Sequence, residues 1–175
     1  MKQLVLVLFL SFSCVISAQY KNVPQAEAVK TIDGILTKML QLLSVEKGNT
    51  MDTKSLKYLF LPNATFSVRS PDKRYPKPFE TVNLEDFIAS LKDNYYESGF
   101  LELETGKVVN EFNGIANVFQ SFYGVDSERN EARGINSYQL VYLENRWWIT
   151  NMIWTFETDD VKIPKQYIKR EIRKR

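Results

Sequence analysis

The side chains that could do chemistry in this chain are carboxylates and tyrosine hydroxyls, because the sequence contains no histidine. That absence removes the commonest general base at neutral pH and the commonest zinc ligand. A protonated carboxyl group and a tyrosine hydroxyl in a dry pocket can together stabilise an enolate. The weak catalytic candidates are Glu104, Glu111 and Tyr138. No spacing selects them, so we assign no catalytic residue and predict neither a cofactor nor a metal site.

Two glutamates, Glu102 and Glu104, lie two residues apart and alternate with leucines. Glu102 and Glu104 therefore share one face of a predicted strand, and Leu101 and Leu103 share the other. The simplest interpretation is a buried leucine face and a solvated glutamate face. Arg133 could pair with a glutamate across the sheet, although such ion pairs are ordinary surface features.

A set of aromatic side chains, together with one amide, could line a pocket for a flat or apolar ligand. The set consists of Tyr58, Phe66, Phe87, Tyr95, Phe122, Tyr138, Asn151 and Trp154. Large aromatic residues also dominate ordinary cores, so simple core packing remains an alternative. The amide of Asn151 would either anchor a ligand or bond to a neighbouring strand, because buried amides need partners.

The stretch from Ala132 to Glu157 predicts the hairpin around which the sheet is organised. Two long strands are joined by a short turn at Glu144, Asn145 and Arg146, and the second strand carries all three tryptophans. Strict alternation would place Trp147, Ile149, Asn151 and Ile153 on one face and Trp148, Thr150, Met152, Trp154 and Phe156 on the other. Both faces are rich in large apolar groups, so we expect both to be covered.

Three amphipathic segments in the N-terminal half predict helices. The first runs from Gln25 to Glu46, and the second begins after a cap at Asp52. The third is capped by Asn83, carries an apolar stripe that reaches Tyr95, and ends before Gly99. Short strands separate these helices. A strand is predicted from Ala64 to Arg69, and an exposed loop from Ser70 to Phe79.

Four long antiparallel strands are predicted to follow. One runs from Phe100 to Phe112 with a bulge at Gly106, the Asn113–Gly114 pair forms a turn, and Ile115 to Tyr123 returns. The fold class is therefore α+β, with a strongly curved, mainly antiparallel sheet and three N-terminal-half helices packed on its concave face.

Composition indicates one domain with a single core. The chain has 175 residues, of which 44% are hydrophobic and 13% aromatic. Its net charge of +2 gives no electrostatic signature for a nucleic-acid partner.

The first eighteen residues predict a cleavable signal peptide. Lys2 precedes an apolar run from Leu4 to Ile16, and the small residues Ser17 and Ala18 favour cleavage after Ala18. The apolar run is shorter than the roughly 20 residues that a membrane-spanning helix needs. Lipid anchoring at Cys14 is the less favoured alternative, because Phe12 stands where a small residue is usual. We therefore expect a secreted or periplasmic protein with residues 19–160 as its domain and no transmembrane span after cleavage.

Residues 161–175 form a basic C-terminal tail. They contain seven basic residues and one acidic residue. Such a tail could bind an anionic partner, but a solvated, partly frayed end is the usual case.

Three motifs in this order resemble the nuclear transport factor 2-like superfamily. They are residues 59–66 (LFLPNATF), residues 83–88 (NLEDFI) and the stretch from Arg146 through Trp154, and the ending at residues 163–168 (IPKQYI) is similar to that of secreted bacterial members. The resemblance implies the cone-shaped fold shared by ketosteroid isomerase, scytalone dehydratase and polyketide cyclases. The resemblance also leads us to expect that the protein forms a homodimer. The fold alone does not specify a reaction, because one fold hosts many functions.

These observations lead to three functional hypotheses. The first is an exported protein that binds a small apolar ligand, or associates with itself through the curved sheet, without catalysis. The second is a cofactor-independent lyase or isomerase that uses a pocket carboxylate and a tyrosine. The third is an envelope interaction module that uses the basic tail.

Overall fold

A curved six-stranded sheet forms the body of the molecule. The computed structural model describes residues 25–71 and 77–169, so the signal peptide and the last six residues of the tail lie outside the described residues. The strands run in the order β2-β1-β6-β5-β4-β3, and all neighbours are antiparallel except β1 and β6, which are parallel. Their bounds are β1 Phe60–Arg69, β2 Phe79–Asn83, β3 Phe100–Phe112, β4 Ile115–Asp126, β5 Glu131–Leu143 and β6 Arg146–Phe156.

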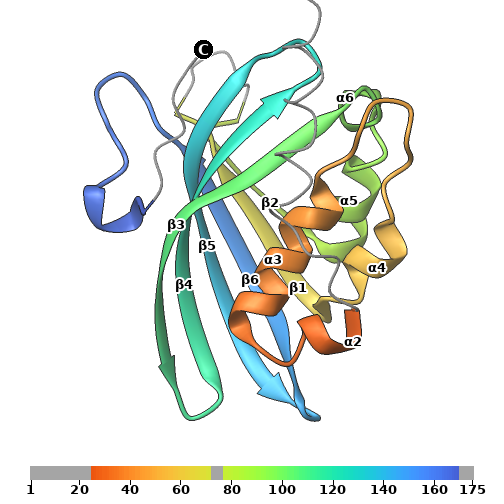
Figure 1. The fold of residues 1–175 in the computed structure, drawn as a ribbon, viewed down its shortest axis with the longest axis vertical. Helices are drawn as coiled ribbons and strands as arrows, with labels where there is room; N and C mark the ends of the chain where they lie inside the picture. The colour runs from red at the N-terminus through yellow and green to blue at the C-terminus, as the bar shows by residue number, and fades with distance from the viewer. Residues whose placement is uncertain (1–24, 72–76, 170–175) are drawn as a thin grey trace, which may run out of the picture.

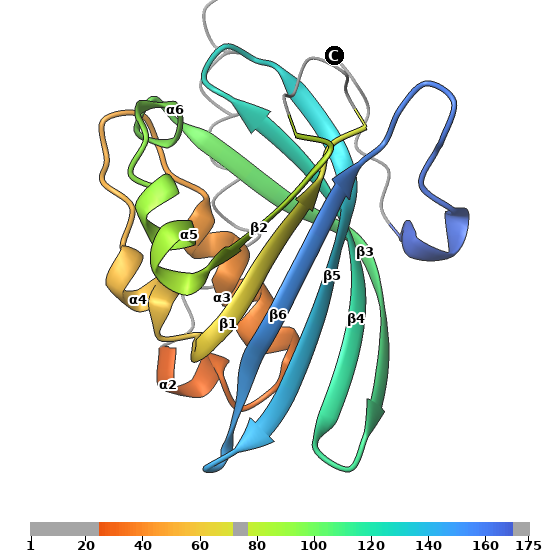
Figure 2. The ribbon, with the colours of Figure 1, turned by 180° about the vertical axis from the view of Figure 1, so that it is seen from behind.

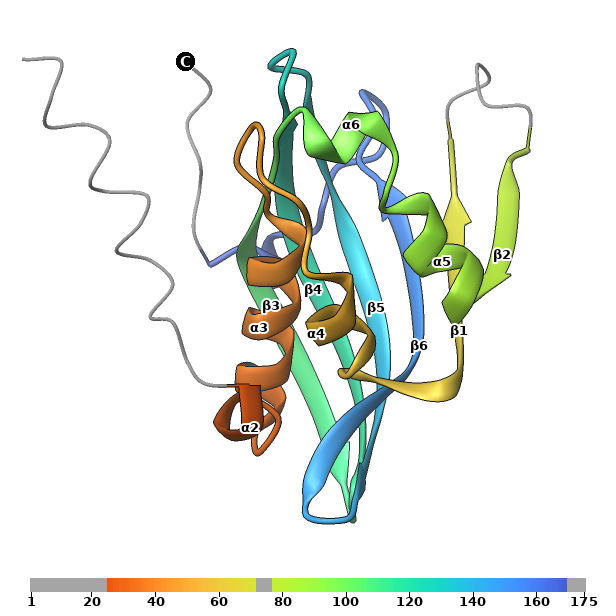
Figure 3. The same ribbon diagram turned by 90° about the vertical axis from the view of Figure 1, so that its right-hand side faces the viewer.

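Short helices gather on one side of this sheet (Figure 1). They are α2 Gln25–Ala28, α3 Ile32–Leu43, α4 Thr53–Lys57, α5 Leu84–Ser90 and α6 Asn94–Glu97. Figure 2 shows the molecule from behind, and Figure 3 shows the helices in front of the strands. A single hydrophobic core joins buried side chains of α3 and α5 to those of β1, β4, β5 and β6. The predicted α+β fold, with a mainly antiparallel curved sheet, is confirmed.

The first predicted helix is divided in two. Thr31 caps α3 by accepting a 2.9 Å hydrogen bond from the Gly34 amide, so α2 and α3 are separate helices and α3 ends at Leu43. A Cβ atom at Gly34 would collide with the carbonyl oxygen of Ala28. Glycine therefore allows the close approach of the two helices, and the apolar periodicity that runs through both segments concealed the break.

The two later helices begin as predicted. Asp52 accepts from the Ser55 amide at 3.0 Å, and Asn83 accepts from the Asp86 amide at 2.9 Å. The third helix was predicted too long, because α5 ends at Ser90. Tyr95 lies on the separate helix α6 and is 47% exposed rather than in the core.

The first strand and the proline-rich loop also differ from prediction. Strand β1 begins at Phe60, because the Ile149 amide bonds to the Leu59 carbonyl and draws this end of β1 into the sheet beside β6. The short edge strand β2 lies at the end of the predicted loop and pairs with β1 from Thr65 to Arg69. Its side chains show no buried alternation, so pairing with β1, rather than its own pattern, makes it a strand.

The sheet has a concave face, toward the helices, and a convex face. We define the concave face by Phe66, Val118, Tyr138 and Met152, all buried in the core. Both tight turns between the long strands use positive φ angles, with Asn113 at 45° and Gly114 at 80° in the turn that was predicted.

A bulge in β6 overturns the predicted alternation of the tryptophan strand. Gln139 pairs with Asn151 but the next residue, Leu140, pairs with Ile149, which leaves Thr150 as an extra residue. Trp147 and Trp154 consequently lie on the same concave side, and Asn151 lies on the convex face. One inserted residue reverses every face assignment beyond it, which sequence alternation cannot reveal.

A second bulge, close to the predicted Gly106, lies in β3. Glu104 pairs with Phe122 and Gly106 pairs with Ser121, so Thr105 is the extra residue. The predicted solvated glutamate face was wrong: Glu102 is buried, with 8% of its surface exposed, and Glu104 is partly buried. Both glutamates point to the concave face, where they accept hydrogen bonds from the amides of Asn136 and Gln120.

Candidate functional site

A buried carboxyl group lies at the end of the concave face where β3 begins, which we call the wide end. The opposite end, at the β5–β6 turn, is the narrow end. Glu102 on β3 accepts a hydrogen bond of 2.8 Å at Oε1 from the Asn136 amide nitrogen on β5. The backbone amide and carbonyl of Glu102 both bond to the Ser44 hydroxyl just after α3, at 3.0 and 3.3 Å. These contacts fix the position of Glu102 between the sheet and the helix layer.

The environment of Glu102 favours the neutral acid. Desolvation raises the pKa of Glu102 from 4.5 to about 7, and the hydrogen bond from Asn136 offsets only part of that effect. Tyr96 on α6 lies near enough to respond: its own burial first, and then the charge of Glu102, raise the Tyr96 pKa to about 12. Glu102 can therefore hold or release a proton near neutral pH.

Glu104 and Tyr138, two of the sequence candidates, are linked on the same face by Gln120. The Gln120 amide donates to Glu104 at 2.8 Å, and its carbonyl oxygen accepts from the Tyr138 hydroxyl at 3.2 Å. Lys107 donates to both oxygens of Glu104, at 2.8 and 2.9 Å, and also contacts Asp33 at 3.2 Å. We call these five residues the concave polar network.

Lys107 supplies the positive charge of the concave polar network. Burial lowers the pKa of Lys107, but the bonds and charges of Glu104 and Asp33 outweigh it and raise that pKa above its ordinary value. Glu104 forms an ion pair with Lys107, and the Glu102 carboxyl accepts a hydrogen bond from the neutral amide of Asn136. With a pKa of about 7, Glu102 is the group of this face that can exchange a proton near neutral pH.

A cluster of aromatic side chains lies next to Asn136 on the helix side. Phe66 and Phe87 stack with ring centroids 3.9 Å apart at 7°, and Trp154 lies 6.4 Å from Phe87. Trp154 is also the β6 partner of Asn136. We call Tyr96, Glu102, Asn136, Phe87 and Trp154 the interior site.

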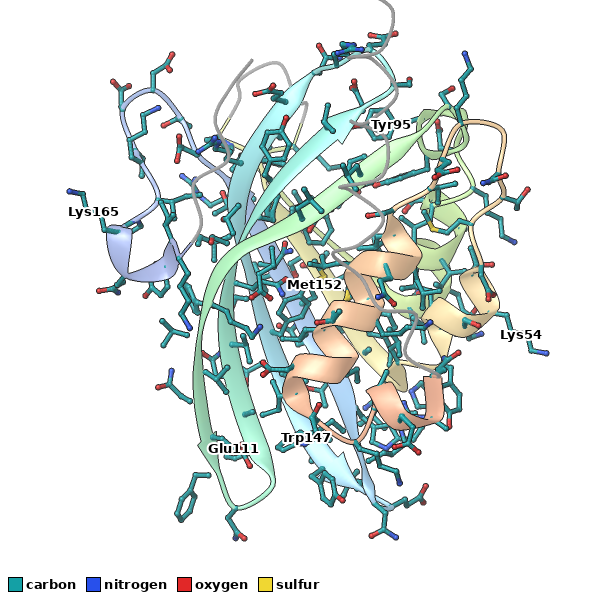
Figure 4. All side chains as sticks on the ribbon, in the orientation of Figure 1. Lys54, Tyr95, Glu111, Trp147, Met152 and Lys165 are labelled. Carbon is teal, nitrogen blue, oxygen red and sulfur yellow. The ribbon has the colours of Figure 1, made fainter. Side chains whose placement is uncertain are left out.

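The structure does not bring the remaining sequence candidates to this site. Tyr58 is 48% exposed at the narrow end, and Asn151 donates to the Thr65 hydroxyl at 2.7 Å on the convex face. Glu111 is exposed near the β3–β4 turn. Tyr95 lies at the other end of the molecule from Glu111 (Figure 4), where its ring is 5.1 Å from that of Tyr96 but is itself 47% exposed.

Two further candidates lie apart from the aromatic cluster. Phe122 is on the concave face and packs 6.2 Å from Phe156. Arg133 lies on the convex face, 5.8 Å from the Tyr123 ring, and not beside Glu104 or Glu111.

Sequence reasoning missed Glu102 and Asn136 as partners. A signal was present: Gln120 and Asn136 occupy polar positions in strands whose next same-face residues, Val118 and Tyr138, are strongly apolar. Polar residues on a buried face need partners, and the glutamates of β3 supply them.

A hollow of about 750 Å³ opens on the outer side of α3, near the start of β3 and the end of β4. Its walls include Leu42, Val45 and Leu101, while Glu102 does not line it. We place the candidate site in the interior, because none of the residues that line the hollow is a buried polar residue.

Residues 25–71 and 77–169 contain no group of three or more acidic or cysteine side chains arranged to hold a metal ion. They also contain no helix that is long and apolar enough to cross a membrane.

Comparison with known proteins identifies the fold. No family model and no curated protein sequence matches the chain. A provisionally named scytalone dehydratase from Novosphingobium aromaticivorans superposes with a TM-score of 0.56 at 13% identity, covering 73% of this chain and 82% of that one. An NTF-2-like protein of unknown function from Shewanella oneidensis gives 0.53 at 17% identity, covering 75% and 99%.

Another NTF-2-like protein of unknown function, from Silicibacter pomeroyi, gives a TM-score of 0.53 at 14% identity, covering 77% of this chain and all of that one. Identities this low carry the fold and not the activity. The helices on one side of a cone-shaped sheet, together with these superpositions, show that the chain has the nuclear transport factor 2-like fold.

Proposed function

We propose that this protein binds a small molecule with an apolar body and one hydrogen-bonding group at the interior site, without catalysis. The observation that carries the proposal is the Glu102 carboxyl, buried beside Asn136, which lies next to the cluster of aromatic rings. Ligand sites of this kind combine apolar walls with a few placed polar groups. Here Phe87 and Trp154 supply the wall, and Glu102 supplies the polar contact.

Access to the site is supported by the pattern of exposure. Glu102 and Phe87 are buried, with 8% and 7% of their surfaces exposed. Trp154 and Tyr96 are only partly buried. The wide end of the concave face is thus the side from which a ligand would enter.

The test uses 2-naphthol, a flat apolar probe with one hydroxyl group. Calorimetric titration at pH 6 and pH 8 compares the wild type with Glu102→Gln, and Glu111→Gln is the control for the same change at an exposed site. The ionised Glu102 accepts the probe's hydrogen bond more strongly than the neutral acid, so wild-type affinity should rise with pH. A charged hydrogen bond contributes about 1.5–3 kcal/mol, and the ionised fraction of Glu102 rises about tenfold between pH 6 and pH 8, so the affinity should rise by up to about tenfold.

Glu102→Gln should bind more weakly at pH 8 and lose the pH dependence, while Glu111→Gln should behave as the wild type. Absence of binding, or the same pH profile in Glu102→Gln, would contradict the proposal.

A second candidate function is proton transfer next to a carbonyl group, as in a lyase or isomerase. The Glu102 pKa of about 7 favours it, since a general base works best when its pKa is close to the working pH. Deuterium uptake at the α-carbon of 1-tetralone, followed by NMR, measures this activity. The rate should rise through pH 7 and disappear in Glu102→Gln; equal rates in both proteins would exclude Glu102 as the base.

Self-association is a separate part of the proposal. Phe112, Ile115 and Ile153 are 77%, 60% and 40% exposed on the convex face, which offers an apolar surface to a second copy. Sedimentation of the wild type and of Ile115→Lys should show a dimer only in the former. We also propose export, and N-terminal sequencing of the mature protein should begin at Gln19.

A further inference from the structure

The C-terminal segment packs against the convex face at the β3 bulge. The strap, as we call residues Pro164–Lys169, contains the 3₁₀ turn η1, Lys165–Tyr167. The Ser121 hydroxyl donates to the Tyr167 carbonyl at 2.6 Å, and the Lys169 amide donates to the Thr105 carbonyl at 2.8 Å. In Figure 1 the strap lies beside β3 and β4, and Figure 4 shows Lys165 pointing away into solvent. This part of the basic tail is therefore anchored, not frayed as the sequence suggested.

The bulge is shaped to receive main-chain atoms. A Cβ atom at Gly106 would collide with the Tyr167 carbonyl oxygen and would lie 2.7 Å from the Lys169 nitrogen. The Tyr167 ring stacks on Phe119 at 5.6 Å and 28°. Thr105 and Ser121 bond to each other at 2.7 Å beneath the strap, and both are buried. The surface that contacts the strap is therefore made of Gly106, the hydroxyl residues Thr105 and Ser121, and the ring of Phe119.

The same bulge determines the other face of the sheet. Glu104 and Lys107 are three residues apart, so regular alternation would place them on opposite faces. The extra residue Thr105 brings both to the concave face, where they form the ion pair of the concave polar network. The strap binds the main chain on one side of the bulge, and the network depends on the bulge from the other side.

We propose that the β3 bulge is a docking site for the strap, and that strap docking positions Glu104 and Lys107 in the concave polar network. The partner that fits this site is a short segment with a free main-chain carbonyl and amide and a tyrosine to stack on Phe119. In this chain the C-terminal segment fills the site in cis. Tyr167 acts as a positioning residue across the sheet.

The test uses the full chain with Gly106→Ala, in which the added methyl group excludes the strap. The matched control is Gly124→Ala on β4, where a Cβ atom would meet the Phe100 ring at 3.7 Å, an ordinary contact. Hydrogen exchange of the Lys169 amide and tryptic cleavage after Lys165 report docking. Both should be at least tenfold faster in Gly106→Ala and unchanged in Gly124→Ala. Equal rates in wild type and Gly106→Ala would overturn the docking site.

A second measurement separates positioning from simple packing. The NMR signals of the Lys107 ammonium group and the Gln120 side-chain amide report the network on the far face. Both should broaden or shift in Gly106→Ala. If the strap is released while these signals stay unchanged, the positioning role is wrong.

Tyr167→Ala provides a second route if Gly106→Ala does not fold. It should speed exchange of the Lys169 amide, and a free peptide of residues 161–169 should restore the wild-type Lys107 and Gln120 signals by occupying the site in trans. Absence of any effect of Tyr167→Ala, or failure of the peptide to restore the signals, would overturn the proposal. None of these readouts involves a ligand at the interior site, so their outcome is independent of the proposed function.

Discussion

Asn136 and Glu102 are joined by a 2.8 Å hydrogen bond although β4 lies between their strands. The bond crosses the concave face, where curvature brings side chains of β3 and β5 together. It leaves a carboxyl group in the interior with a neutral donor, and this arrangement has consequences for stability as well as for binding.

Stability should fall as the pH rises from 5 to 8 because of Glu102. The pKa of this carboxyl is about 7 in the folded protein and 4.5 ordinarily. Between these two values the unfolded chain loses the proton while the folded protein keeps it. The difference amounts to about 3 kcal/mol, lost between pH 4.5 and 7 and constant above. Urea unfolding at pH 5 and pH 8 measures it.

Glu102→Gln keeps an acceptor for Asn136 and has no proton to lose, so it should remove this decline and be the more stable protein at pH 8. The lowered pKa values of Asp52 and Asp126 act oppositely, but below their ordinary value of 3.8 and outside the window. Parallel pH profiles for wild type and variant would contradict the assignment.

Arg146→Lys should destabilise the narrow end of the sheet. The Arg146 guanidinium lies 4.0 Å from the Tyr58 ring centre and 3.7 Å from that of Trp148, and it donates to the Tyr58 carbonyl at 2.7 Å. Lysine cannot reproduce the planar contact between two rings, so we expect a loss of about 1–3 kcal/mol. Thermal unfolding should show it, with Arg69→Lys, an exposed site on β1, as the neutral control.

Two substitutions in the β5–β6 turn should stabilise the protein. Glu144 and Asn145 have φ angles of 52° and 61°, which cost energy for residues with a side chain. Asn-Gly is the favoured pair for such a turn and already occupies the β3–β4 turn. The double substitution Glu144→Asn, Asn145→Gly should raise the free energy of unfolding by about 1 kcal/mol. Denaturant unfolding that shows no gain would indicate that the loop's own contacts, not backbone strain, dominate.

Two aromatic candidates for the ligand pocket should respond differently to truncation. Phe87→Ala removes a buried ring stacked on Phe66 and should cost about 3–5 kcal/mol. Tyr95→Ala affects an exposed ring on α6 and should cost less than about 1 kcal/mol. Similar losses for the two variants in urea unfolding would contradict the placement of these residues.

Local signals in the sequence were sufficient for much of the fold. The caps at Asp52 and Asn83, the Asn113–Gly114 turn and the tryptophan hairpin were all predicted correctly, because each depends on residues within a few positions of one another. The α+β class followed from the order of these elements. The end of α5 was predicted wrongly, because the apolar periodicity continues past Ser90 toward Tyr95.

The faces of the long strands were decided only by tertiary structure. Thr150 inserts one residue into β6, and period-two alternation is reversed beyond this insertion, which the sequence did not reveal. The solvated position predicted for Glu102 was wrong for another reason, because its partner Asn136 is thirty-four positions away in the sequence. The amino-acid sequence by itself determined which elements form and where they turn, since those depend on neighbouring residues. Which side chains meet across the sheet was determined by register and curvature, which arise only when distant strands pair.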